Sequence, residues 1–406
     1  MEIIIIGGGA SGMMAAIIAA RNGNQVTLIE KNDMLGKKLL ATGNGRCNFT
    51  NLFCTPNDYF GKEQFAKSSF DRFGVKETLK FFRELGILER EEGEGRVYPF
   101  SAQGASVLEA LRYEIESLGI NVLLSTKVNK TSFKAGKFIL QTENGKEITG
   151  DRLILATGGK AGPVYGSTGD GYKFAEQFGH KINNPRPALV KLICQESYFV
   201  KLKGVRAKGK VSIKSSNKSH VYSDTGEIQF TENGISGICV FNISRFAGDS
   251  PTIAAIDFFP EFREEELISI LMQRKGTMGD RPIGMILNGM INSKIIPVLL
   301  SEIGVEKRIK NCKDLDSEII KSIIQKLKNW TLQVKKIGDF NDAQTTVGGI
   351  DLSQVSQQTM ESKLLPGLYF TGEVLDMDAK CGGYNLQWAW TSGYIAGASC
   401  GGNSNC

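Results

Sequence analysis

Residues 1–30 constrain the fold more than any other part of this 406-residue chain. An apolar run at residues 3–6 leads into a turn at 7–12 with the spacing G-x-G-x-x-G, and Glu30 ends a second apolar run at 26–29. In such a strand, turn, helix and strand unit, the glycines allow a tight turn, close approach of the backbone to a pyrophosphate, and close packing of helix on strand. A carboxylate at the end of the second strand can hydrogen-bond a ribose. The pattern therefore predicts a Rossmann-like α/β domain that binds a dinucleotide.

Composition and charge narrow the class of protein. Hydrophobic residues make up 41% and charged residues 23%, as is usual for globular proteins. The net charge of +6 comes without a long basic run, so we expect a small-molecule substrate and no nucleic-acid partner. Residues 3–20 are apolar, but glycines interrupt them and no basic residue precedes them, which is typical of neither a signal peptide nor a membrane span. We therefore expect a cytoplasmic protein with no membrane partner; the oligomeric state is not indicated.

Cysteine and histidine spacing predicts no metal centre. The eight cysteines form no C-x-x-C pair, and the only histidines are His180 and His220. This pattern indicates neither a zinc site nor a disulfide framework. Both histidines lie away from the glycine motifs, so we expect them to be structural or exposed.

The character of the sequence changes along the chain, which predicts an inserted region. Residues 1–186 and 347–406 combine glycine motifs with apolar strand and helix patterns, and we expect them to form one nucleotide-binding α/β domain. Residues 187–260, with about 331–346, alternate apolar and polar residues in short runs, as in an antiparallel sheet or barrel. Residues 261–330 read as helices. The two halves of the outer domain must then meet to complete one site.

Glycine-rich clusters recur where strands are expected to end. They lie at residues 7–12, 36–48, 156–159, and 371–373 together with 381–387. In open α/β sheets, ligands bind at the carboxyl ends of the strands. We therefore expect all these clusters to line a single extended site.

The clusters resemble the signature of the BaiN-like NAD(P)/FAD-dependent oxidoreductases, a group of two-dinucleotide-binding-motif flavoproteins. The resemblance covers essentially the whole chain. It implies a Rossmann-like FAD-binding domain interrupted by an inserted β-barrel-like and helical region. The residues that carry it are Gly36-Lys37-Lys38, residues 42–48, Gly348-Gly349-Ile350, Thr371-Gly372-Glu373 and Gly382-Gly383-Tyr384-Asn385.

The resemblance implies which residues hold the pyrophosphate and adenosine of FAD. Glu30 would bind the ribose, and the main chain of Val128 would meet the adenine. Lys37 and Lys38 would offset phosphate charge or pair with Glu30; plain solvated lysines are the alternative. The further residues expected along this part of the cofactor are Gly9, Ala10, Ser11, Thr157, Gly158, Gly372 and Glu373.

A second group of residues is expected around the flavin ring. A helix beginning near Gly383 would direct its N-terminus, with the N–H groups of Asn385 and Leu386, at the edge where a reduced flavin carries negative charge. Gly43 and Asn44 would let the ring approach the backbone. The remaining ring-side candidates are Arg46, Cys47, Asp376, Asp378 and Tyr384.

The roles of the ring-side candidates stay open at this point. Arg46 could clamp a phosphate or a substrate carboxylate, or simply anchor its loop. Tyr384 and Arg46 are the candidate proton donors, with plain packing an equal alternative for Tyr384. Cys47 is better explained as a small buried packing residue than as a redox thiol, because it has no nearby cysteine partner.

The sequence contains only one dinucleotide fingerprint, so NADH or NADPH is expected as a transient reductant. Our leading hypothesis is reduction of a conjugated C=C bond in an enone, such as a 3-oxo-4,6-diene bile-acid intermediate, which the resemblance implies. One alternative is oxidation of a small amine such as aminoacetone, with oxygen as acceptor and hydrogen peroxide as product. Another is a non-catalytic flavin redox sensor or RNA-associated module, which the lack of basic runs disfavours.

Overall fold

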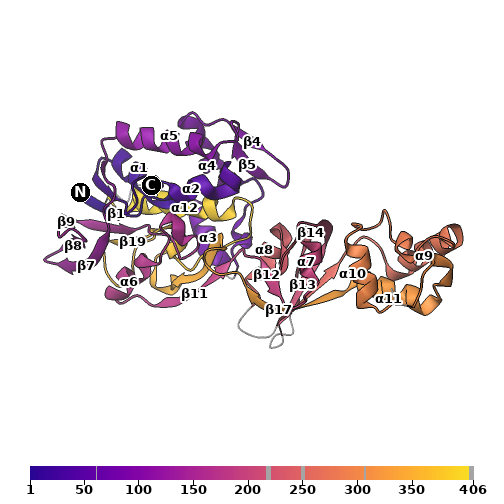
Figure 1. Ribbon diagram of the computed structural model, residues 1–406. Coiled ribbons are helices and arrows are strands. Elements are labelled where there is room, and N and C mark those ends of the chain that lie inside the picture. The colour runs from indigo at the N-terminus through magenta and orange to yellow at the C-terminus, as the bar shows by residue number, and fades with distance from the viewer. Residues whose placement is uncertain (61, 216–220, 248–251, 306–307, 402–406) are drawn as a thin grey trace. The chain divides into compact units, whose positions relative to one another are not determined.

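The protein is described by a computed structural model over residues 1–60, 62–215, 221–247, 252–305 and 308–401. The chain forms two compact units, Met1–Pro187 with Ala343–Cys406, and Ala188–Asp342 (Figure 1). The role predicted for His220 and the loose tail predicted beyond Gly401 lie outside the described residues. Among the helices that the structure describes, none combines the length and apolar character needed to cross a membrane.

The first unit is built on a five-stranded parallel sheet. Four of its strands are mostly buried and apolar, as expected where helices cover both faces of a parallel sheet, whereas the edge strand β6 (Asn121–Leu123) is exposed to half-buried. The C-terminal strand β19 lies beside β10, so both halves of the interrupted domain share one sheet. This confirms the predicted Rossmann-like α/β fold. The strand order is β19 (Leu368–Phe370), β10 (Arg152–Leu155), β1 (Glu2–Ile6), β2 (Gln25–Ile29) and β6 (Asn121–Leu123).

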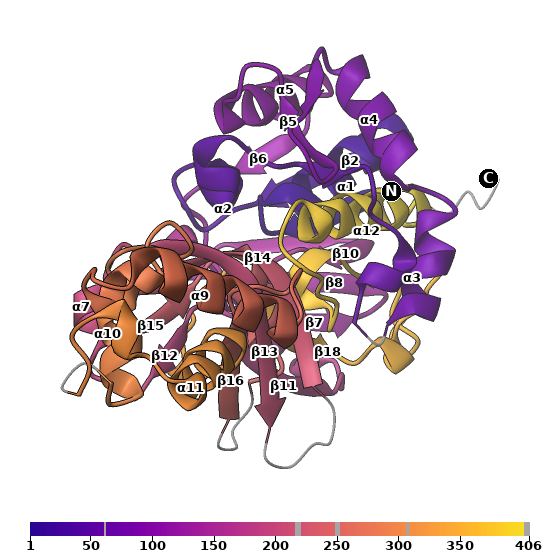
Figure 2. The same cartoon turned by 90° about the vertical axis from the view of Figure 1, so that its right-hand side faces the viewer.

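Helices and small sheets complete the first unit. The C-terminal helix α12 (Tyr384–Ser399) lies beside the N-terminal helix α1 (Ala10–Arg21), as both views show (Figures 1 and 2). The helices are α1 (Ala10–Arg21), α2 (Lys37–Ala41), α3 (Glu63–Phe70), α4 (Val75–Glu84), α5 (Gly104–Ser117), α6 (Asp170–Gln177) and α12 (Tyr384–Ser399). The small sheets are β3 (Thr50–Asn51) with β5 (Arg96–Pro99) and β4 (Glu89–Glu91); β7 (Val128–Lys134) with β8 (Lys137–Thr142) and β9 (Glu147–Gly150); and β11 (Ile182–Ala188) with β18 (Thr345–Ile350).

The second unit contains a closed antiparallel barrel, which confirms the predicted barrel-like insertion. Alternate residues face inward; Val211 and Ile213 of one strand and Leu332 of another are fully buried there. The barrel order is β12 (Leu192–Cys194), β15 (Gly234–Ser236), β14 (Val221–Thr231), β13 (Arg206–Ser215), β16 (Thr252–Asp257) and β17 (Trp330–Ile337).

Three of the helices of the second unit lie within residues 261–330, where the sequence predicts helices, and two shorter ones lie among the barrel strands, where the sequence predicts none. Asp316 begins one of them, because its side chain accepts a hydrogen bond from the backbone N–H of Ile319 and caps the first turn. The same helix buries Ile320, Ile323 and Leu327 along one face. The helices are α7 (Phe199–Leu202), α8 (Ile238–Ser244), α9 (Glu264–Met278), α10 (Ile295–Glu302) and α11 (Ser317–Lys328).

Candidate cofactor and active site

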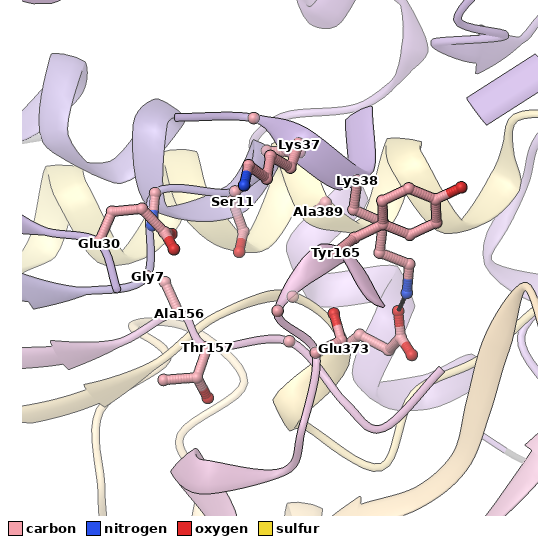
Figure 3. Close-up of a pocket in the computed structure, with 18 of the residues that line it drawn as sticks. Gly7, Ser11, Glu30, Lys37, Lys38, Ala156, Thr157, Tyr165, Glu373 and Ala389 are labelled. Carbon is pink, nitrogen blue, oxygen red and sulfur yellow. Dashed lines mark hydrogen bonds and ion pairs between the residues drawn. The ribbon is translucent and has the colours of Figure 1, made fainter. Parts of the chain in front are cut away.

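The glycine turn after β1 has the geometry that its spacing predicts. Gly7 has a φ of +109°, and a side chain there would collide with the carbonyl oxygen of Ala156. A side chain at Gly12 would collide with the carbonyl oxygen of Gly7. At Gly9, by contrast, an added Cβ would have no heavy atom within 4 Å. The first and third glycines therefore allow close packing, and the second leaves the backbone open toward a pocket (Figure 3).

Two helices begin at this pocket with free N-termini. Gly9 precedes α1 and Gly383 precedes α12; within the described chain neither helix has a side-chain cap or an acidic residue in its first turn. The backbone N–H groups of a first turn have no partner inside the helix and carry partial positive charge. Each N-terminus is therefore suited to bind an anionic or electron-rich group.

The two helices run in the same direction. A Cβ on Gly393 would lie 2.5 Å from the carbonyl oxygen of Ser11, and one on Gly397 would lie 2.6 Å from that of Ala15. Contacts that advance together along both helices mean parallel packing. At about 1.5 Å per residue, the N-terminus of α12 extends about 12 Å beyond that of α1. Two positive helix ends thus line one side of an elongated pocket.

Glu30 forms the far end of the pocket, at the carboxyl end of β2. One of its carboxylate oxygens accepts from the backbone N–H of Gly8 and the other from that of Asn32, each at 2.8 Å. Val128 and Thr157 line the same region. The hydroxyl of Thr157 is buried and has no hydrogen-bond partner among the described residues. That hydroxyl lies close to Gly171 of α6, where an added Cβ would be 2.0 Å from it, so its burial reflects packing of α6 on this loop.

The two predicted lysines bind carboxylates other than Glu30. Lys37 pairs with Asp33 at 2.7 Å, and this ion pair lowers the pKa of the Asp33 carboxyl. Lys38 pairs with Glu373 at 2.8 Å, an interaction marked in Figure 3. The hypothesis that either lysine pairs with Glu30 is wrong in this structure, because both find closer acids. The Lys38–Glu373 pair instead joins the N-terminal and C-terminal parts of the site.

Most residues predicted to hold the cofactor line this pocket. Sequence reasoning missed several others, although Lys31 and Asn32 directly follow Glu30. The missed lining residues include Lys31, Asn32, Tyr165, Asp170, Phe174, Gln344, Trp388 and Ala389. The predicted residues that line it are Gly9, Ala10, Ser11, Glu30, Lys37, Lys38, Val128, Thr157, Gly158, Gly372, Glu373, Asn385 and Leu386.

Gly43 and Gly383 lie outside that lining but close to each other, around Asn48. A Cβ on Gly43 would lie 2.9 Å from the backbone nitrogen of Asn48, and one on Gly383 would lie 3.0 Å from its side-chain oxygen. That oxygen is buried without a hydrogen-bond partner among the described residues. Asn44 has a φ of +56°, the left-handed conformation that asparagine tolerates. That Gly43, Asn44 and Gly383 lie beside a flavin ring stays a prediction.

Arg46 is held by its own loop surroundings. Its guanidinium pairs with Glu92 at 2.6 Å and lies 4.3 Å from the centre of the Tyr98 ring. These contacts favour the loop-anchoring role over a free clamp. Cys47 beside it is fully buried, which raises the pKa of its thiol to about 12 and agrees with a packing role.

Tyr384 begins α12 and is buried. Its carbonyl oxygen accepts from the hydroxyl of Tyr59 at 2.8 Å, and the ammonium of Lys380 lies 4.7 Å from its ring centre. Burial raises the pKa of the Tyr384 phenol, so the group stays protonated at neutral pH. Of the two acids expected on this face, Asp376 is bound by Lys62 at 2.9 Å and Asn183 at 2.8 Å, and Asp378 is buried. The ranges that the structure describes contain no cluster of His, Cys, Asp and Glu placed to hold a metal ion.

Comparison with known proteins assigns the family. Residues 1–399 match the family model described as HI0933-like protein Rossmann domain. The chain is 38% identical to the 3-dehydro-bile acid delta(4,6)-reductase of Clostridium scindens, and 32% identical to the ribosomal RNA dihydrouridine synthase of Haemophilus influenzae. Each of these similarities covers 98% of both chains.

A solved structure shows the same fold. The 3-ketosteroid-delta4-(5alpha)-dehydrogenase from Rhodococcus jostii RHA1 superimposes with a TM-score of 0.53 at 15% identity, over 98% of this chain and 97% of that one. At this identity the likeness concerns the fold alone. The family match over nearly the whole sequence decides the assignment: the chain belongs to the HI0933-like Rossmann family, a family of flavoprotein oxidoreductases.

Proposed function

We propose that this protein binds FAD and uses NADH or NADPH to reduce a C=C bond conjugated with a carbonyl group. The observation that carries the proposal is the elongated pocket with two parallel helices whose uncapped N-termini are offset by about 12 Å along the helix axes. One end suits the pyrophosphate of a dinucleotide, and the other suits an electron-rich ring edge. The names of the relatives support the chemistry, since a delta(4,6)-reductase and a dihydrouridine synthase both saturate a C=C bond.

The net reaction is balanced by a hydride and a proton. NADH or NADPH gives up a hydride, the carbon β to the carbonyl accepts it, and the α carbon takes a proton; NAD⁺ or NADP⁺ and the saturated carbonyl compound result. Bound FAD supplies the route by which the two electrons pass from one substrate to the other. We expect this reaction in the cytoplasm, with the nicotinamide as a transient reductant.

The chain's own residues would bind the cofactor and position the reactants. Glu30 would hold a ribose with the oxygen lone pairs that its two backbone bonds leave free, and the N–H groups at Ala10 and Ser11 would meet the pyrophosphate. Asn385 and Leu386, in the first turn of α12, would meet the ring edge. Tyr384 is our candidate proton donor, because it begins α12 directly before the residues expected at the ring edge.

The first substrate candidate is a 3-oxo-4,6-diene bile-acid intermediate. It rests on the 38% identity with the Clostridium scindens reductase. The second candidate is a uridine of ribosomal RNA, whose C5=C6 bond is likewise conjugated with a carbonyl. It rests on the relative from Haemophilus influenzae and on the basic charge of the inserted unit. This second candidate contradicts the expectation that the protein has no nucleic-acid partner, and that expectation remains a prediction.

A two-step anaerobic experiment tests the proposal. The flavin-loaded protein is mixed with NADH or NADPH and its absorbance is followed; the reduced protein is then offered the bile-acid diene, deproteinised ribosomal RNA or oxygen. We expect rapid bleaching by the nicotinamide and rapid reoxidation by one of the two unsaturated substrates. Bleaching by a small amine alone, with peroxide formed in air, would support the amine-oxidase alternative instead. If the flavin is reduced or reoxidised only slowly by every reactant, the redox-sensor hypothesis is the one that remains.

A further inference from the structure

The net positive charge of this chain lies almost entirely in its second unit. Residues 188–342 contain 23 lysines and arginines against 18 acids, a net charge of +5 out of +6 for the whole chain. Within this unit, residues 201–218 contain no acidic residue. The basic residues of that segment are Lys201, Lys203, Arg206, Lys208, Lys210, Lys214 and Lys218.

Strand β13 arranges four of these residues in a line. Successive side chains of a strand point to opposite faces. Val211 and Ile213 point into the barrel and are fully buried, whereas the even-numbered basic residues are exposed on the outside. At about 3.3 Å per residue, the line is about 26 Å long. We call it the β13 basic row; it consists of Arg206, Lys208, Lys210 and Lys214 (β13 is labelled in Figure 2).

The neighbouring strands do little to neutralise this row. Lys214 lies opposite Val221 of β14 and Ile253 of β16, neither of which carries charge. Lys210 lies opposite Thr225 of β14 and Asp257 of β16. The carboxylate of Asp257 is already bound by Lys328, at 2.7 Å. The residues facing this end of the row therefore leave its charge largely uncompensated.

Among the described residues, Arg206 is the one member of the row that forms an ion pair. Glu227 of β14 lies opposite Lys208, but its carboxylate binds Arg206 at 3.1 Å. Within the part of the chain that the structure describes, Lys208, Lys210 and Lys214 form no ion pair. Three ammonium groups on one face of the strand, at intervals of two and four residues, are thus left to interact with a partner.

We propose that the β13 basic row binds the sugar-phosphate backbone of RNA. The inference rests on the second substrate candidate, a uridine of ribosomal RNA. Lysine and arginine contacts to phosphates supply affinity and orientation without reading sequence. A straight row of cations about 26 Å long matches a charged polymer better than a single small anion. A lipid surface fits less well, since membrane-bound basic faces combine charge with a broad apolar helix face. Beside this row, the exposed apolar Val221 and Ile253 lie only opposite Lys214, and the polar Ser223 and Thr225 lie farther along β14.

A charge-matched pair of triple variants tests the row. The row variant carries Lys208→Gln, Lys210→Gln and Lys214→Gln, and the control variant carries Lys275→Gln, Lys294→Gln and Lys310→Gln in the helical region of the same unit. Binding of a fluorescent oligouridylate and of deproteinised ribosomal RNA is measured over a range of salt concentrations. We expect the row variant to bind at least about 10-fold more weakly and the slope of log K against log salt to fall by about 2. The control variant should bind nearly as well as the parent, and both should keep the parent's flavin content and thermal midpoint.

Several outcomes would overturn the row as an RNA surface. Equal losses of RNA affinity in both variants would show a general charge effect. If the parent protein does not bind RNA, RNA is not the partner of this surface. Row-dependent binding to phosphatidylserine vesicles, but not to RNA, would assign the surface to membranes. Dihydrouridine formation is measured separately. If RNA binds through the row but its uridines are never reduced, the uridine candidate is rejected and the row is kept as an RNA-binding surface. If the parent and the row variant reduce uridine at equal rates and bind RNA equally well, only the assignment of the row as the RNA-binding surface is rejected.

Discussion

Ser11 and Gly393 bring the two helices of the cofactor site into backbone contact. An ideal Cβ on Gly393 would lie 2.5 Å from the carbonyl oxygen of Ser11, closer than real side chains approach. The contact lies more than two turns along α12 from its N-terminus, so the position of that N-terminus depends on a packing residue outside the pocket. The cofactor site is therefore sensitive to the size of a residue that touches no ligand.

Enlarging Gly393 should separate these helices. Gly393→Ala is expected to lower the free energy of unfolding by about 1 to 3 kcal/mol, the usual cost of overpacking, and to reduce the flavin retained on purification. Gly276→Ala is the matched control, because an added Cβ at this position, in the last turn of α9, would meet no heavy atom within 4 Å. That control should be neutral or stabilising by up to about 1 kcal/mol. Urea unfolding and flavin absorbance check both, and equal effects would contradict the helix-contact explanation.

Glu30 should matter more for the folded turn and its cofactor than a surface acid does. In Glu30→Gln the amide keeps one acceptor oxygen, so one of the N–H groups of Gly8 and Asn32 loses its partner. We expect FAD to bind at least about 10-fold more weakly and the apoprotein to lose about 1 to 3 kcal/mol. Glu2→Gln, which removes only an exposed pair with Lys137, is the control. Fluorescence titration of the apoprotein with FAD measures the first effect and urea unfolding the second; wild-type FAD affinity in Glu30→Gln would contradict the ribose assignment.

Local patterns and long-range contacts differed in how well the sequence predicted them. The turn at residues 7–12 was predictable because its glycine spacing is read within one strand, turn and helix. The parallel packing of α1 on α12 was not, since Ser11 and Gly393 are far apart in sequence and no periodicity relates them. The same holds for Lys38, whose partner Glu373 belongs to the other half of the domain. The β13 basic row is not a run of consecutive basic residues and was therefore not predicted. Basic side chains separated by one residue share a face only in a strand.

Tyr384 can be tested as a proton donor by separating the two half-reactions. Tyr384→Phe keeps the ring beside Lys380 but removes the phenol, whose raised pKa keeps it protonated at neutral pH. If the phenol donates the proton, reoxidation of the reduced protein by the unsaturated substrate should slow by about 10²-fold, with reduction by NADH or NADPH unchanged. Stopped-flow absorbance resolves the two rates. Changes below a few-fold in both would assign Tyr384 to packing.

His180 should make the protein less stable in mild acid. It is buried, its Nε2 lies 2.9 Å from the hydroxyl of Ser362, and its ring packs edge-on against Phe370. Burial lowers the pKa of His180 below its usual value of about 6.5, so the unfolded chain takes up a proton that the folded protein resists. The stability due to the neutral ring is therefore complete above about pH 6.5 and is lost as the pH falls below that value toward the lowered folded-state pKa. His180→Gln, which can still bond to Ser362 but does not titrate, should flatten this decline in urea unfolding between about pH 7 and pH 5. If plots of unfolding free energy against pH stay parallel for the parent and the variant over this interval, protonation of His180 is not coupled to folding.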